Sequence, residues 1–150
     1  MTEEFVTFEI AEKLKEEGYN KPFYFYYRTD DECIHHVNTC APLVNSDKID
    51  DEVVIAPTIS QVLNWLRKVK NIDIEIHAEA GMLGDKVYVP FISTYTEFTL
   101  ETSPEVVRYR QKKFNPTIPL PHEIIPTLTY FKEWEEAALM GIEFVLDNLI

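Results

Sequence analysis

Apolar residues recur at helical spacing near the start of the chain. One apolar face consists of Ile10, Ala11 and Leu14, and charged side chains make up the opposite face. Thr7 is placed to cap the first turn, and Gly18 is placed to end the helix. The pattern therefore predicts an amphipathic helix over residues 7–17.

The clearest helix signal covers residues 58–70. Thr58 and Gln61 are three residues apart, the spacing of a capping box, in which each side chain can bond the backbone N–H of the other residue. Apolar residues follow at helical spacing: Ile59, Val62, Leu63, Leu66 and Val69. A third helix is predicted over residues 131–148, from the same spacing in Trp134, Ala138, Ile142, Val145 and Leu149.

Other stretches alternate with a period of two, which is typical of strands. In residues 23–28 one face carries Phe23, Phe25 and Tyr27, and the other carries Tyr24, Tyr26 and Arg28. Residues 72–79 alternate small or branched apolar residues with Asp73, Glu75, His77 and Glu79. Short apolar runs at 53–57 and 87–100 predict further strands, and Pro90 indicates a sheet edge or a bulge in the second of these.

These elements together predict an α+β fold in a single domain that spans residues 1–150. We expect a small, mostly antiparallel sheet of about four strands, packed by about three helices. The polar stretch 29–52 is expected to be a long connection, and residues 102–114 suit either a helix or a strand. The expected core consists of Ile10, Leu14, Phe25, Val62, Leu66, Ile74, Ile76, Val145 and Leu149.

The charge balance narrows the classes of function. The chain carries 26 Asp and Glu against 14 Lys and Arg, a net charge of −12. Such a field disfavours nucleic acid and anionic membranes, since both carry negative charge. The first residues lack a basic, apolar leader, and no apolar run approaches the length of a membrane helix. We expect a cytoplasmic protein with reduced cysteines and no cofactor.

Three segments of the chain form a recognisable set: "FVTFEIAEKLKEEGYN", "APTISQVLNWLRKVKNIDIEI" and the terminal "WEEAALMGIEFVLDNLI". Together they resemble a family of small hypothetical proteins from gut Bacteroides and their phages and prophages. In that family a PT-x-S-x-x-x-x-WL helix leads into an I-x-I-x-I strand, and an EEA-x-x-x-GI-x-x-x-L helix closes the chain. The resemblance implies an uncharacterised accessory protein. It does not extend over residues 93–130, which look like an insert that is atypical of the family.

Four groups that could bind a metal lie within eight residues of each other: Cys33, His35, His36 and Cys40. Thiolates and imidazoles are the ligands that zinc prefers. The spacing C-x-H-H-x3-C differs from familiar zinc sites, and neighbouring histidines on an extended chain point to opposite sides. We expect buried cysteines and surface histidines in a loop, with a zinc site as the alternative.

One basic cluster stands out against the acidic background: Arg108, Arg110, Lys112 and Lys113. It could bind an anion or an acidic partner, although pairing with the protein's own carboxylates is the simpler interpretation. The sequence contains no G-x-S-x-G, P-loop, G-x-G-x-x-G or H-E-x-x-H motif. We therefore expect a protein that is not an enzyme.

The leading hypothesis is a non-enzymatic module that binds a protein partner of unknown identity. This hypothesis also leaves open a homodimer that forms through an aromatic edge strand. Two alternatives remain: an acidic DNA mimic that decoys nucleic-acid enzymes through carboxylates at residues 3–17, 30–32 and 47–52, and a zinc-dependent module built on the Cys33–Cys40 cluster.

Overall fold

The computed structural model describes residues 4–38, 42–43, 51–80, 84–95, 106–110 and 131–150. The chain divides into two compact units, residues 1–61 and 62–150. Each unit holds its own antiparallel sheet of three strands. The single domain expected from the sequence stays a prediction.

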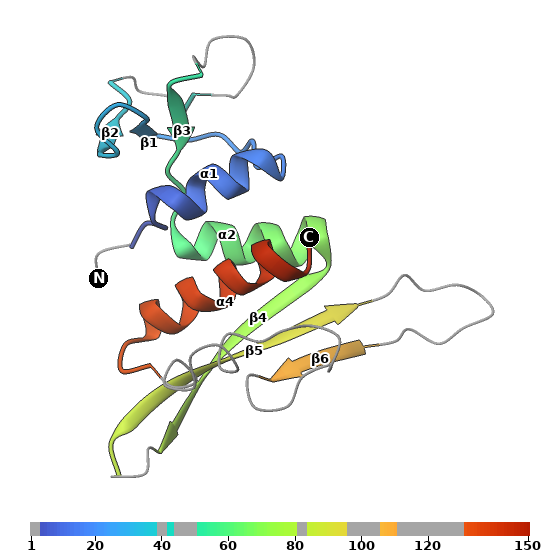
Figure 1. Ribbon diagram of the computed structural model, residues 1–150. Coiled ribbons are helices and arrows are strands. Elements are labelled where there is room, and N and C mark those ends of the chain that lie inside the picture. Colours follow the sequence, from blue (N-terminus) through green and yellow to red (C-terminus); the bar gives the residue numbers. More distant parts are fainter. Residues whose placement is uncertain (1–3, 39–41, 44–50, 81–83, 96–105, 111–130) are drawn as a thin grey trace, which may run out of the picture. The chain divides into compact units, whose positions relative to one another are not determined.

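The sheet of the first unit is built around β1 (Phe25–Arg28), which lies between β2 (Ile34–His36) and β3 (Val53–Ile55). Both neighbours pair with β1 in antiparallel fashion (Figure 1). The predicted alternation of this segment is confirmed, because Phe23 and Tyr27 are buried on one face while Tyr24 is 41% exposed on the other. The period of two thus decides which aromatic rings enter the core.

Helix α1 (Phe8–Glu16) begins and ends as the sequence predicts. The Thr7 hydroxyl accepts a bond from the Ile10 N–H. At the other end Gly18 adopts a left-handed conformation with φ of 85°. Its N–H donates to the Lys15 carbonyl, and the Tyr19 N–H donates to the Leu14 carbonyl. These two bonds form a Schellman motif, which satisfies carbonyls that the helix leaves unpaired.

Helix α2 (Ile59–Trp65) begins with the predicted capping box. The Thr58 N–H donates to Gln61 Oε1 (3.0 Å), and the Gln61 N–H donates to Thr58 Oγ1 (3.3 Å). The predicted helix does not stay α-helical to its end, because residues Leu66–Lys70 form a π-helical turn. This wider turn changes the helical phase, and Val69, predicted to lie on the apolar stripe, is 53% exposed.

The sheet of the second unit has β5 (Lys86–Tyr95) between β4 (Ile72–Ala80) and β6 (Val106–Arg110) (Figure 1). The predicted strand at 72–79 is confirmed, with Ile72 and Ile74 buried. Residues 106–110, which suited either a helix or a strand, form a strand. This strand lies inside the expected insert at 93–130, most of which falls outside the described residues.

Pro90 lies on the central strand, so the prediction of an edge strand is wrong for β5 as a whole. The Tyr88 N–H donates to the Phe131 carbonyl, on the side of β5 that faces away from β4. Because backbone groups alternate sides, the nitrogen of Pro90 faces that same side. Described pairing with β6 begins only at Phe91. The missing N–H of Pro90 therefore removes no ladder bond in the described part of the sheet.

Helix α4 (Trp134–Asn148) covers one face of β4 and β5 (Figure 1). Gly141 makes the closest approach, since a Cβ atom at that position would lie 3.0 Å from Ile74 Cγ2 and 3.3 Å from Pro90 Cβ. Both neighbouring atoms belong to stiff side chains. Because glycine has no side chain, Gly141 allows α4 to pack closely against this face of the sheet.

The predicted α+β class is confirmed, but the strands form two sheets instead of one. The predicted connection at 29–52 was wrong in part, since it contains β2. Of the expected core, six residues are buried: Ile10, Leu14, Val62, Leu66, Ile74 and Val145. Phe25, Ile76 and Leu149 are only half-buried. Among the described residues, no helix has both the length and the apolar character that crossing a membrane requires.

We predict that Gly141→Ala destabilises the protein although alanine favours helices. The helix gains about 1 kcal/mol from the substitution, whereas overpacking a core typically costs roughly 1–3 kcal/mol. The free energy of unfolding from denaturant titration measures the balance. In an Ile74→Ala background the closest clash is gone, so the same substitution should become neutral or stabilising. An equal loss in both backgrounds would contradict the close contact.

Candidate functional site

The structure places the predicted metal ligands on the hairpin formed by β1 and β2. His35 and His36 lie on β2, and Cys33 immediately precedes it. Their rings contact different neighbours: His35 stacks on Tyr26 at 5.5 Å, while His36 stacks on Tyr24 at 6.4 Å. The two histidines therefore lie on opposite faces of the strand, as alternation requires.

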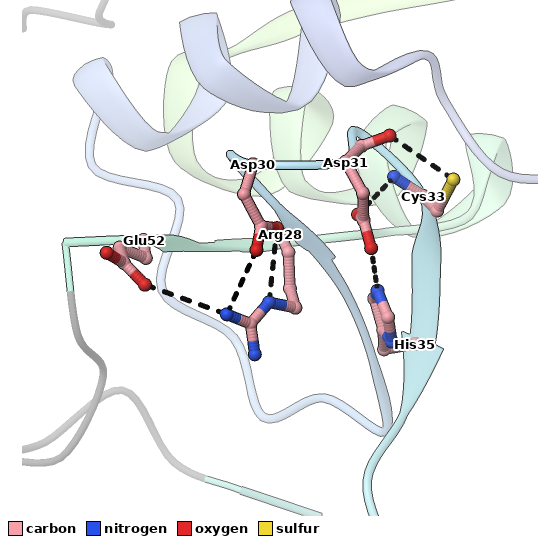
Figure 2. A network of polar contacts seen from close by, with 6 residues as sticks. All are labelled: Arg28, Asp30, Asp31, Cys33, His35 and Glu52. Carbon is pink, nitrogen blue, oxygen red and sulfur yellow. Dashed lines mark hydrogen bonds and ion pairs between the residues drawn. The ribbon is translucent and has the colours of Figure 1, made fainter.

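Asp31 organises the turn of this hairpin (Figure 2). Its Oδ1 accepts the Cys33 N–H at 2.8 Å, and its Oδ2 lies 2.9 Å from His35 Nε2. The bond from the Cys33 amide is the largest of the causes that act on the pKa of Asp31, which is lowered below 3.8. Desolvation opposes this effect, and the hydrogen bond and charge of His35 and the charge of Arg28 add to the lowering. The neighbouring Glu32 adopts a left-handed backbone conformation with a φ of 52°. The carboxylate of Asp31 therefore supports a turn that contains a left-handed residue.

Arg28 closes the other side of the same turn (Figure 2). Its Nε and Nη2 donate to the two carboxylate oxygens of Asp30, both at 3.2 Å, and Nη2 lies 3.7 Å from Glu52. All three side chains are well exposed, so these pairs stabilise the fold only weakly. The network fixes the shape of the turn and leaves an acidic surface around it.

This arrangement does not resemble a zinc site in the part of the chain that the structure describes. No group of three or more His, Cys, Asp and Glu side chains converges there on a common point. Cys33 is exposed and is a free cysteine, and its thiol donates to the Asp31 carbonyl. The expectation of a buried cysteine is thus wrong for Cys33. Cys40 lies outside the described residues, and the zinc alternative stays a prediction.

The basic cluster is only partly covered by the structure. Arg108 and Arg110 lie on β6, where the backbone alone is described. Lys112 and Lys113 lie outside the described residues. The anion or partner patch that the sequence predicted there stays a prediction.

A pocket of about 230 Å³ opens on the first unit, at the end of β1 opposite the acidic turn. Its apolar lining consists of Phe5, Pro22, Phe23, Tyr24, Phe25, Pro42 and Ala56. Thr58 and Gln61, the capping box of α2, are its polar residues. Among the described residues that line the pocket, the Tyr24 phenol is the only titratable group.

A buried tyrosine holds one wall of this aromatic pocket in place. The Tyr27 hydroxyl donates to the Val6 carbonyl at 2.5 Å, and the Val6 N–H donates to the Pro57 carbonyl. The segment that carries Phe5 is therefore bonded on both sides. The Phe5 ring in turn lies 4.9 Å from the Phe25 ring. Burial raises the pKa of Tyr27 above 10.0, and the charge of Glu9 adds to the rise.

We use the term rim for two large apolar side chains that the first unit exposes: Tyr24, which lines the pocket, and Leu43, which follows the lining residue Pro42 in the chain. Tyr24 is 41% exposed, and Leu43, which follows Pro42, is 43% exposed. The backbones of Leu43 and Phe23 exchange two hydrogen bonds, which holds Leu43 beside the lining. Grouped exposed apolar residues are typical of interaction surfaces.

Sequence reasoning missed this pocket. Phe23, Tyr24 and Phe25 were read as two faces of a strand, and Thr58 and Gln61 as a cap. Nothing in their spacing brings Phe5 and Pro42 to the same place. The one available signal was the run of five aromatic residues from 23 to 27. No protein family, curated protein or solved structure matches this chain.

We predict that Tyr27→Phe destabilises the first unit by about 1–3 kcal/mol, because the Val6 carbonyl loses its partner in a buried place. Calorimetry gives the change in stability. Because the pKa of Tyr27 is raised in the folded protein, its contribution to the free energy of unfolding is fully present below pH 10.0. This contribution is lost as the pH rises through the pKa of the folded state. The variant lacks the ionisable hydroxyl, so it should lose less stability at alkaline pH than the original protein. Identical alkaline profiles would contradict this role.

We predict that His35→Ala raises the pKa of Asp31, which carbon NMR of the carboxyl group measures directly. Cys33→Ser is the matched control, because the backbone N–H that Asp31 accepts remains, and the pKa should not change. Since the folded pKa is lowered, Asp31 stabilises the turn above its unfolded pKa, and this contribution is lost as pH falls through the folded value. An unchanged pKa in His35→Ala would mean that the imidazole contact contributes nothing.

Proposed function

We propose that this protein is a non-enzymatic, protein-binding module and that the aromatic pocket of the first unit is its contact surface. The observation that supports the proposal is the combination of an apolar pocket with exposed apolar side chains on its rim. Burying such side chains against a partner is favourable at roughly 25 cal/mol per Å².

The size of the pocket favours a side chain as its occupant. Sites for cofactors and drug-sized molecules usually measure about 300–1,000 Å³, whereas this pocket measures about 230 Å³. The described residues of its lining also include none of the charged groups that anchor a phosphate or a carboxylate. A single side chain from another protein suits these dimensions better than a free metabolite.

The biological setting is part of the proposal and depends on the sequence. The resemblance to hypothetical proteins of Bacteroides phages and prophages suggests an accessory protein of a mobile element that acts in the cytoplasm. The acidic composition is in keeping with that setting. The partner would then be a protein of the host or of the same element.

The proposal is tested by affinity capture from Bacteroides cells that carry a related prophage. We predict that the protein captures a partner and that Tyr24→Ser and Leu43→Ser on the pocket rim reduce the recovery about tenfold, as expected when an apolar contact of about 1.4 kcal/mol is lost. Quantitative mass spectrometry of the captured proteins measures the recovery.

Val69→Ser is the matched control. It replaces another exposed apolar residue, 53% exposed, in the second unit, and should leave the recovery unchanged. Circular dichroism of all three variants establishes that they fold. A partner recovered equally well with every variant would place the contact surface elsewhere, and no partner above background would contradict the proposal.

A further inference from the structure

We propose that the aromatic pocket of the first unit binds a proline-rich segment of a partner protein, in the polyproline II conformation and with basic residues beside the prolines. This inference rests on the proposed function and names the chemical class of the partner. It combines three features of the unit: a wall of aromatic rings, polar groups that offer hydrogen-bond donors, and an excess of negative charge.

Aromatic rings form much of the wall of the pocket. Four of the described residues that line it carry such rings: Phe5, Phe23, Tyr24 and Phe25. The Phe5 and Phe25 rings lie 4.9 Å apart, and the Tyr24 ring stacks on His36 at 6.4 Å, which supports its orientation. Proline-rich segments in the polyproline II conformation dock on surfaces of this kind, where their rings pack against aromatic rings.

The polar groups of the lining have donors to offer. Thr58 is only 4% exposed, and its hydroxyl oxygen accepts the Gln61 N–H. Within the part of the chain that the structure describes, no hydrogen bond uses the proton of this hydroxyl, the amide N–H groups of Gln61 or the hydroxyl of Tyr24. A buried donor without an acceptor is costly. A ligand that brings a carbonyl oxygen to Thr58 removes this cost.

The backbone acceptors beside these donors are already in use. The carbonyls of three consecutive lining residues each accept a backbone N–H: Phe23 from Leu43, Tyr24 from Val37, and Phe25 from Ala56. An ordinary peptide brings one N–H per residue, and each N–H needs an acceptor. Proline has no N–H, and the polyproline II conformation leaves its carbonyls unpaired. A proline-rich segment therefore brings acceptors to a surface that offers donors.

The volume of the pocket favours a ligand that loses little freedom when it binds. At about 230 Å³ the pocket can bury only a limited apolar area, so the ordering of a flexible ligand would offset much of the gain. Proline loses no side-chain rotamer freedom, and its ring fixes φ at about −65°. A phenylalanine or leucine anchor would lose rotamer freedom and would also bring a backbone N–H.

The charge of the unit selects basic residues beside the prolines. Residues 1–61 contain 13 Asp and Glu against five Lys and Arg, which accounts for −8 of the chain's −12. Glu4 is exposed and directly precedes the lining residue Phe5. Lysine or arginine next to the prolines is therefore attracted by the field of the unit, whereas acidic residues are repelled.

The test uses a short run of prolines between two lysines, with a fluorescent label. Fluorescence anisotropy measures its dissociation constant with the full-length protein, and NMR of the Gln61 side-chain amide shows where it binds. We predict a saturable shift of this amide signal. Replacing the prolines by alanines removes the rings and restores the N–H groups, and should weaken binding about tenfold or more. A peptide with one phenylalanine among alanines should also bind more weakly.

Gln61→Glu separates the donor from the helix cap. Glutamate also serves in a capping box, so the Thr58 N–H keeps its acceptor and the variant should fold. The amide donor is replaced by a carboxylate, which repels a carbonyl oxygen, and binding of the proline peptide should weaken about tenfold. Charge alone would strengthen the binding of a lysine-flanked peptide. Tyr24→Phe keeps the ring and removes the hydroxyl, and should weaken binding roughly fivefold.

Some outcomes would overturn this inference and leave the proposed function standing. Equal binding of the phenylalanine peptide would assign an aromatic anchor instead, and tighter binding by Gln61→Glu would show that charge alone attracts the peptide. A dimer that the peptide dissociates in size-exclusion chromatography would make a second copy of this chain, which carries P-x-x-P at residues 116–119, the occupant. Capture of a cellular partner that is lost in Tyr24→Ser, with no binding of the proline peptide, would also reject the inference alone. Failure of both experiments would reject the proposed function as well.

Discussion

The buried hydroxyl of Tyr27 is the constraint on which the candidate site depends. A polar group in a protein core needs a partner, and Tyr27 finds one in the Val6 carbonyl. Together with the bond from the Val6 N–H to the Pro57 carbonyl, it holds the segment ahead of α1 in place, and this segment supplies Phe5 to the aromatic pocket. The core of the first unit and its binding surface are therefore parts of one arrangement, because the strand that buries Tyr27 on one face exposes Tyr24 on the other.

The edge strands of the two sheets differ in length and in charge. β4 is an edge strand of nine residues, and its polar positions include Asp73, Glu75 and Glu79. A second chain pairing along it would bring carboxylates beside carboxylates, a common means of protecting an exposed edge. The short β2 has no such charge: its outward backbone groups belong to Ile34 and His36.

Much of the fold could be predicted because it depends on local pattern. The helix at α1, its cap at Thr7, the capping box of Thr58 and Gln61, and the alternation in β1 and β4 are all confirmed. The failures have local physical causes as well. β2 was missed because its three residues carry no alternating apolar signal, and the π-helical turn moved Val69 off the apolar stripe. His35 and His36 lie on opposite faces of β2, as the sequence predicted for an extended chain.

The sequence by itself determined the α+β class, the acidic charge and the helix ends, since periodicity, composition and capping act over a few residues. Only the tertiary structure decided that the strands divide into two sheets, that Pro90 lies on a central strand, and that Phe5 and Pro42 meet Phe25 around a pocket. These depend on contacts between residues far apart in the chain, such as Tyr27 with Val6 and Gly141 with Ile74. No local pattern contains such contacts, because packing and the pairing of buried polar groups select them only when the chain folds.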